Sequence, residues 1–175
     1  EVDDLGHTGG GSLTASHSVM ITVNPVNDAP TFTVPAPQTA YEEVPLVFSA
    51  ANGNPIVVHD VDAQALPLRV TLSAYGGRMT LGGTFGLSFT TGDGTDDELM
   101  TFSGSLANIN AALDGLSFTA PPGFAGEGNI QIYADDLGNS GDGGPAANGA
   151  TRAEPRHRRP ATASRQQSRS STPAA

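Results

Sequence analysis

Asp60 and Asp62 are the pair of carboxylates with the clearest chemical meaning in the sequence. In an extended chain two residues one position apart point to the same side, with Cα atoms about 7 Å apart. Carboxylates this close can share a cation, and calcium takes six to eight oxygen ligands at about 2.3–2.6 Å. Asn27 and Asp28 offer further side-chain oxygens. These residue types predict cation binding, and ordinary solubilising charge is the alternative.

No motif in the sequence predicts catalysis. The chain has no Cys, and it contains no His-Glu-x-x-His motif, phosphate loop or Gly-x-Ser-x-Gly nucleophile elbow. Scattered carboxylates could pair as they do in glycosidases. However, the chain has no Trp and only three Tyr that could stack on a sugar. We therefore expect that the protein is not an enzyme.

A second acidic cluster occupies residues 93–98, with the sequence Asp-Gly-Thr-Asp-Asp-Glu. The calcium loop of an EF-hand needs acidic or amide residues at positions 1, 3 and 5 and Glu at position 12. The cluster does not meet this spacing. It therefore predicts a solvated hairpin turn.

Short alternating segments predict the elements that position these residues. In residues 67–74, Leu68, Val70 and Leu72 alternate with polar residues, which is typical of a strand with one buried face. Further strands are expected at residues 17–24, 31–34, 46–50, 78–81, 87–89, 99–102, 116–120 and 129–134. Many short strands separated by turn residues favour an all-β sandwich.

One segment has helical spacing instead. Leu106, Ile109 and Leu113 fall on one face of a helix, with Ser103 or Ser105 as the N-cap and Gly115 as the stop. We expect one short helix over residues 105–113 that covers an end of the sandwich.

An internal repeat divides the chain. The sequence Asp-Asp-Leu-Gly-His-Thr-Gly-Gly-Gly at residues 3–11 recurs at 135–143, with six of nine positions identical at an offset of 132. Pro30 then marks a break between strand patterns, because proline cannot donate a hydrogen bond. We therefore expect residues 1–26 to be the end of one repeat, and residues 27–146 to form a second.

The junction Val-Asn-Asp-Ala-Pro at residues 26–30 resembles that of bacterial cadherin-like repeats, which occur in tandem in giant surface adhesins. Residues 59–63, 101–110 and 134–139 also resemble these repeats, and the similarity covers about residues 1–146. It implies a cadherin-like or immunoglobulin-like antiparallel β-sandwich. It also implies calcium held between domains by these side chains: Asn27, Asp28, Asp60 and Asp62, with Asp135 as the next candidate.

The resemblance implies a calcium-stabilised spacer or adhesion repeat of a large bacterial surface or secreted protein. Its partners would be neighbouring repeats and cell-surface or matrix ligands, at an extracellular location. Residues 1–148 carry 17 acidic residues against two Arg, which favours cations over nucleic acid as partners. No apolar stretch is long enough for membrane insertion. The alternative is a carbohydrate-binding module appended to an extracellular enzyme.

Residues 147–175 differ in composition from the rest of the chain. Residues 149–175 contain six Arg and one Glu, and no aliphatic residue larger than Ala follows Leu137. This composition predicts a disordered basic tail. A nucleic-acid-binding arm and a change of reading frame are alternatives. Because the tail replaces the counterpart of residues 17–23, we expect the second repeat to lack its closing strand and to take that strand from another chain.

Overall fold

The computed structural model describes residues 2–3, 5, 9–11, 14–63, 66–138, 144–153 and 155–157. It has one helix, α1 (Leu106–Leu113), among the described residues. The strands are β1 (Val2–Asp3), β2 (Thr14–Ala15), β3 (Thr31–Thr33), β4 (Gln38–Ala40), β5 (Leu46–Phe48), β6 (Val57–His59), β7 (Pro67–Tyr75), β8 (Arg78–Thr80), β9 (Ser88–Thr91), β10 (Leu99–Ser105), β11 (Leu116–Thr119), β12 (Asn129–Asp135), β13 (Ala147–Ala153) and β14 (Pro155–His157).

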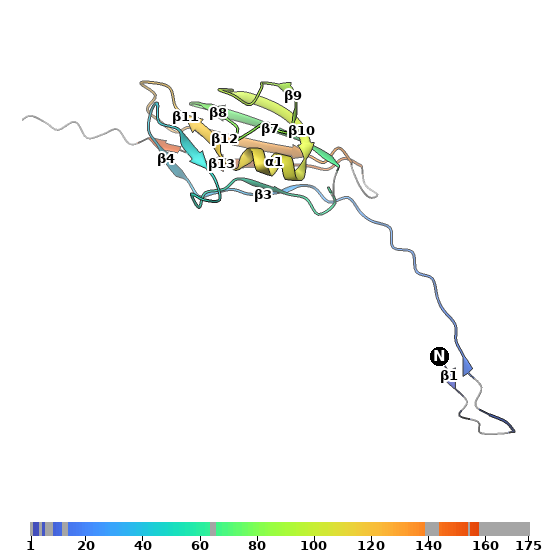
Figure 1. Cartoon of the computed structure of the whole chain (residues 1–175). Coiled ribbons are helices and arrows are strands. Elements are labelled where there is room, and N and C mark those ends of the chain that lie inside the picture. Colours follow the sequence, from blue (N-terminus) through green and yellow to red (C-terminus); the bar gives the residue numbers. More distant parts are fainter. Residues whose placement is uncertain are drawn as a thin grey trace, which may run out of the picture.

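The predicted all-β sandwich is confirmed. One layer is a sheet of order β13-β12-β7-β10-β9, in which every neighbouring pair is antiparallel. Strands β5, β11 and β8 form a separate sheet on the other side of the core. Two further pairs, β3 with β6 and β4 with β14, complete the fold (Figure 1).

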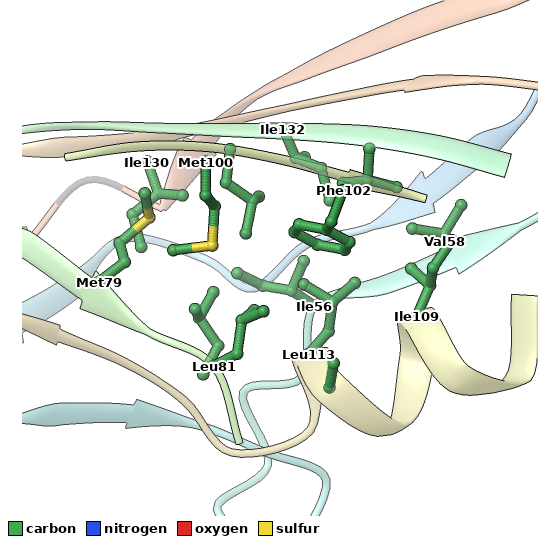
Figure 2. Close-up of a cluster of buried hydrophobic side chains, with 14 of the residues drawn as sticks. Ile56, Val58, Met79, Leu81, Met100, Phe102, Ile109, Leu113, Ile130 and Ile132 are labelled. Carbon is green, nitrogen blue, oxygen red and sulfur yellow. The ribbon is translucent and has the colours of Figure 1, made fainter. Parts of the chain in front are cut away.

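The core forms where the alternating strands turn their apolar faces inward. Leu68, Val70 and Leu72 of β7 are fully buried, as their spacing predicts. Figure 2 shows side chains of β10 and β12 pointing toward those of α1 and β8. The largest fully buried side chains are Phe48, Phe102, Phe118, Leu68, Leu72, Met79, Met100, Ile109, Leu113, Leu116, Val58 and Val70.

Helix α1 begins and ends as its sequence predicts. Ser105 is the N-cap, and its hydroxyl accepts a hydrogen bond from the Asn108 backbone N–H at 3.3 Å. Ile109 and Leu113 are fully buried. Gly115 follows with a φ of 106°, a conformation that favours glycine.

The two copies of the internal repeat have the same local geometry. In each copy the Leu after the acidic pair has a positive φ, 57° at Leu5 and 61° at Leu137. In each, the Leu backbone N–H donates to the carboxylate two residues earlier, at 2.9 Å to Asp3 and 2.8 Å to Asp135. Because β1 pairs with β2 and β12 pairs with β13, both copies are antiparallel hairpins.

The strand predicted at residues 17–24 is wrong. Residues 16–25 lie outside every strand, and Figure 1 shows this segment leading away from the sandwich as an extended chain. A strand needs a neighbour for its backbone hydrogen bonds. Strand β1 offers only Val2 and Asp3, and their partners are Ala15 and Thr14. The ladder therefore ends before residue 16.

The expectation that the second repeat lacks its closing strand is also wrong. Strand β13 pairs with β12 along its whole length, from Ala147 opposite Asp135 to Ala153 opposite Ile130. Strand β14 then pairs in parallel with β4. Regular structure therefore extends further than the composition predicts, because backbone hydrogen bonds do not require apolar side chains. Residues 158–175 of the predicted tail lie outside the described residues.

Candidate cation site at the linker junction

The linker meets the sandwich at a turn that follows β6. The Asp28 backbone N–H donates to Asp62 Oδ2 at 2.7 Å. Within the turn, Asp60 Oδ1 accepts from the backbone N–H groups of Asp62 and Ala63, at 2.8 Å each. The short polar side chain of Asp60 thus holds the turn in shape, as Asp does in Asx turns. The structure therefore brings Asp28, Asp60 and Asp62 together, as the sequence predicts.

Asn27 contacts a different part of the sandwich. Its side-chain Nδ2 donates to Asp136 Oδ2 at 2.6 Å and to the Gly144 carbonyl at 3.0 Å. Asp136 is only 1% exposed, and its Oδ1 accepts from the backbone N–H groups of Gly138 and Ala146 at 2.8 Å each. Asp136 therefore joins the linker to the loop between β12 and β13.

Asp135, the sequence candidate, occupies a different environment from Asp136. Its Oδ2 pairs with the Arg69 guanidinium, and its Oδ1 accepts from the Leu137 backbone N–H at 2.8 Å. Both oxygens are thus already engaged, and Arg69 supplies the compensating charge. Sequence reasoning missed Asp136, although the repeated Asp-Asp pair pointed to both residues.

The junction contains two buried oxygens that have no hydrogen-bond partner. Among the described residues, Asn27 Oδ1 and Asp60 Oδ2 are the buried side-chain polar atoms without one. Buried polar atoms in native proteins are nearly always satisfied, by protein, water or an ion. One of the two oxygens comes from the linker and the other from the turn after β6. Both belong to residues predicted to bind a cation.

The number of ionised groups at the junction limits the kind of cation site it can form. Within the described ranges, no three His, Cys, Asp or Glu side chains come together in a group that could hold a metal. A cation here would need amide and backbone oxygens or water beside the carboxylates, which calcium accepts. A hollow of about 290 Å³ lies against Asp28, Thr31, His59 and Asp60. His59 Nε2 lies 2.9 Å from Thr33 Oγ1, so this ring has a protein partner.

The electrostatics of Asp136 are set by its hydrogen bonds. Burial raises the pKa of this carboxyl, because it disfavours the charged form. Hydrogen bonds from the Gly138 and Ala146 backbones and from Asn27 outweigh burial and hold the pKa below its ordinary value. Asp136 is therefore ionised at neutral pH.

The acidic cluster at residues 93–98 forms the hairpin turn that the sequence predicts. Asp97 Oδ2 accepts from the backbone N–H groups of Asp93 (3.0 Å) and Gly94 (2.8 Å). Asp93 Oδ1 in turn accepts from the Thr95 N–H at 2.9 Å. These carboxylates satisfy the backbone of their own loop between β9 and β10.

A larger cleft opens where β7 turns into β8. It has a volume of about 770 Å³, and its lining includes Tyr75, Arg78, Glu98 and Pro121. Arg78 pairs with Glu98 at 3.1 Å across it. Tyr75 is 65% exposed, so its ring is available to a ligand.

Comparisons with known proteins identify no relative. No protein-family model, no curated protein and no solved structure matches the chain. In the part of the chain that the structure describes, no helix has the length and apolar character needed to span a bilayer.

Proposed function

We propose that this chain is a spacer repeat of a large bacterial surface or secreted protein, stabilised by calcium at the linker junction. The observation that carries the proposal is the pair of buried, unpartnered oxygens, Asn27 Oδ1 and Asp60 Oδ2. A cation bound by both residues would join the linker to the sandwich. Neighbouring repeats and cell-surface or matrix ligands are the partners that such a spacer would have.

The proposed mechanism is neutralisation of charge followed by stiffening of the linker. Asp60 and Asp62 lie in one turn, and the Asp28 backbone is hydrogen-bonded to Asp62. A divalent cation would offset the repulsion between these carboxylates and restrict the linker relative to the sandwich. The amide and backbone donor set suits calcium, whose ligands are all oxygens. The role is therefore structural, without a catalytic step.

A thermal melt tests the proposal. Calcium sites in extracellular modules have dissociation constants of about 0.1–1 mM, so 10 mM calcium should add about 1.4–2.7 kcal/mol of stability. We expect the melting temperature to rise by several degrees relative to a chelator-treated sample at equal ionic strength. Asp60→Asn combined with Asp62→Asn should abolish most of the rise.

The matched control is Asp93→Asn combined with Asp96→Asn, which removes two charges from the hairpin between β9 and β10. This variant should keep the full calcium response. A wild-type melt that does not change with 10 mM calcium, or an equal loss of response in both double variants, would contradict the proposal.

The cleft beside β7 and β8 favours a second candidate function, a carbohydrate-binding module. An exposed aromatic ring and a neighbouring Arg78–Glu98 pair are groups that can stack on and hydrogen-bond to a sugar. Saturable binding of an oligosaccharide that is lost in Tyr75→Ala would favour this candidate over the spacer.

A further inference from the structure

An apolar strand sequence lies unpaired before the linker. Val19, Ile21 and Val23 alternate with Met20 and Thr22, as in a strand with one buried face. In the structure all three lie outside every strand, and each is more than 80% exposed. Three exposed branched residues on one side of an extended segment are an unpaired strand face, which invites association.

The internal repeat identifies the position in a sandwich that such a strand fits. The hairpin β1–β2 is the counterpart of β12–β13, with the same turn at Leu5 and Leu137. The offset of 132 residues aligns Ala15 with Ala147 and Ile21 with Ala153. Residues 17–23 therefore have the sequence position of the strand that pairs with β12.

The register of the first hairpin determines which side chains would face the core. Val2 pairs with Ala15, and Val2 is the counterpart of Ala134, which is fully buried. Because antiparallel partners point to the same face, the residues two, four, six and eight positions beyond Ala15 would also face inward. These include Val19, Ile21 and Val23. In this register Val19 lies opposite Ile130.

Strand β13 supplies smaller residues at this edge. Its residues opposite Ile132 and Ile130 are Ala150 and Ala153, and Asn148 lies opposite Ala134. Val and Ile bring more apolar surface than Ala or Asn, and the hydrophobic contribution grows with the area buried. The β12 edge therefore has a better-fitting strand elsewhere in the same sequence.

A chain cannot place this strand against its own β12. Strand β13 starts beside Asp135, at the end of β12 where Asn27 contacts Asp136. If Ala15 took the place of Ala147, Val23 would lie about 26 Å further along the sheet. Only four residue steps separate Val23 from Asn27, and they span at most about 14 Å. A second copy of the chain has no such restriction.

We propose that residues 17–23 of one copy add to the β12 edge of a second copy, in place of β13. Main-chain hydrogen bonds would supply pairing, and Val19, Ile21 and Val23 would supply specificity, as in other strand additions. Strand β13 competes from within its own chain with the advantage of a high effective concentration. The exchange therefore depends on protein concentration, and it does not involve the cation site.

Sedimentation velocity on the 175-residue chain tests the proposal. In chelator-treated buffer we expect association that grows with protein concentration. Ile21→Asp should weaken it by about tenfold or more, because the exchange would bury an unpaired charge. Met20→Asp is the matched control, since it adds the same charge one residue away on the opposite face. Both positions are exposed in the unassociated chain, at 83% and 95%, so neither substitution should affect folding.

Disulfide trapping checks the register, and the absence of native Cys makes it clean. In the proposed register Ser18 lies opposite Gln131, and directly opposed Cβ atoms are about 4.5–5.5 Å apart. A mixture of Ser18→Cys and Gln131→Cys chains should form a mixed disulfide on oxidation. Thr22→Cys, about 13 Å further along the strand, should not trap Gln131→Cys.

Association weakened selectively by Ile21→Asp, together with the 18–131 disulfide, would establish the exchange. A chain that stays monomeric at all concentrations would overturn the proposal. So would equal effects of Ile21→Asp and Met20→Asp, or equal trapping from positions 18 and 22.

Discussion

Asp136 accepts three hydrogen bonds in a position that is almost wholly buried, and one of them comes from the linker residue Asn27. The sequence pointed to the acidic pair of which it is part, since the pair recurs near the N-terminus. It could not distinguish the two residues, because that depends on where β12 ends. Asp135 closes the strand beside Arg69, and Asp136 begins the loop that meets the linker.

Replacing Asp136 should change how stability depends on pH. A carboxyl whose pKa is lower in the folded state stabilises the fold above its unfolded pKa of about 3.9, and loses that contribution as pH falls through the folded pKa. Asp136→Asn should therefore lower the free energy of unfolding by about 1–3 kcal/mol at pH 7, because it disrupts a buried hydrogen-bond set. The deficit relative to wild type should shrink below about pH 4.

Urea unfolding between pH 2 and 8 measures this difference. The control is Glu127→Gln, which removes one charge from an exposed side chain. A deficit that stays constant over the whole pH range would show that the charge of Asp136 contributes nothing to the junction.

At the scale of elements, the sequence predicted the strands and the helix whose apolar spacing is strong. The buried face of β7 and the cap and apolar residues of α1 follow directly from residue type. Strands β4 and β6 were missed, since three residues are too few to show alternation. The strand expected at residues 17–24 has the right alternation, but pairing depends on a neighbour that sequence pattern does not supply.

Asn110 is an anchor between elements that the spacing did not reveal. Its Oδ1 accepts from the Val58 N–H and its Nδ2 donates to the Val58 carbonyl, both at 2.9 Å. It thereby joins α1 to β6, the strand that leads into Asp60. Asn110→Ala leaves two backbone groups unpaired beside a buried residue, so we expect a loss of about 2–4 kcal/mol in the free energy of unfolding.

Asn108→Ala on the same helix is the comparison. Its side chain makes one long contact of 3.5 Å with the Gly86 carbonyl, so its loss should cost about 0.5 kcal/mol or less. Chemical denaturation of both variants measures the difference. Similar losses in the two variants would show that the contact with Val58 has no special weight.

At the scale of the whole molecule, the all-β class could be predicted because turn residues and alternation recur along the chain. The junction could be predicted only in part. Asn27, Asp28, Asp60 and Asp62 have residue types that suit calcium, and the structure places Asp28, Asp60 and Asp62 at one turn. The two unpartnered oxygens could not be predicted, because they depend on burial and on where every neighbouring donor points.

Nuclear magnetic resonance of the labelled chain during a calcium titration tests the central claim most directly. We predict saturable shifts at the side-chain carbonyl carbon of Asn27 and the carboxylate carbon of Asp60, the groups that carry the unpartnered oxygens. The carboxylate carbons of Asp93 and Asp97, in the hairpin between β9 and β10, should not change. No shift at Asn27 and Asp60 up to 10 mM calcium, or shifts of equal size at Asp93 and Asp97, would contradict a calcium-stabilised junction.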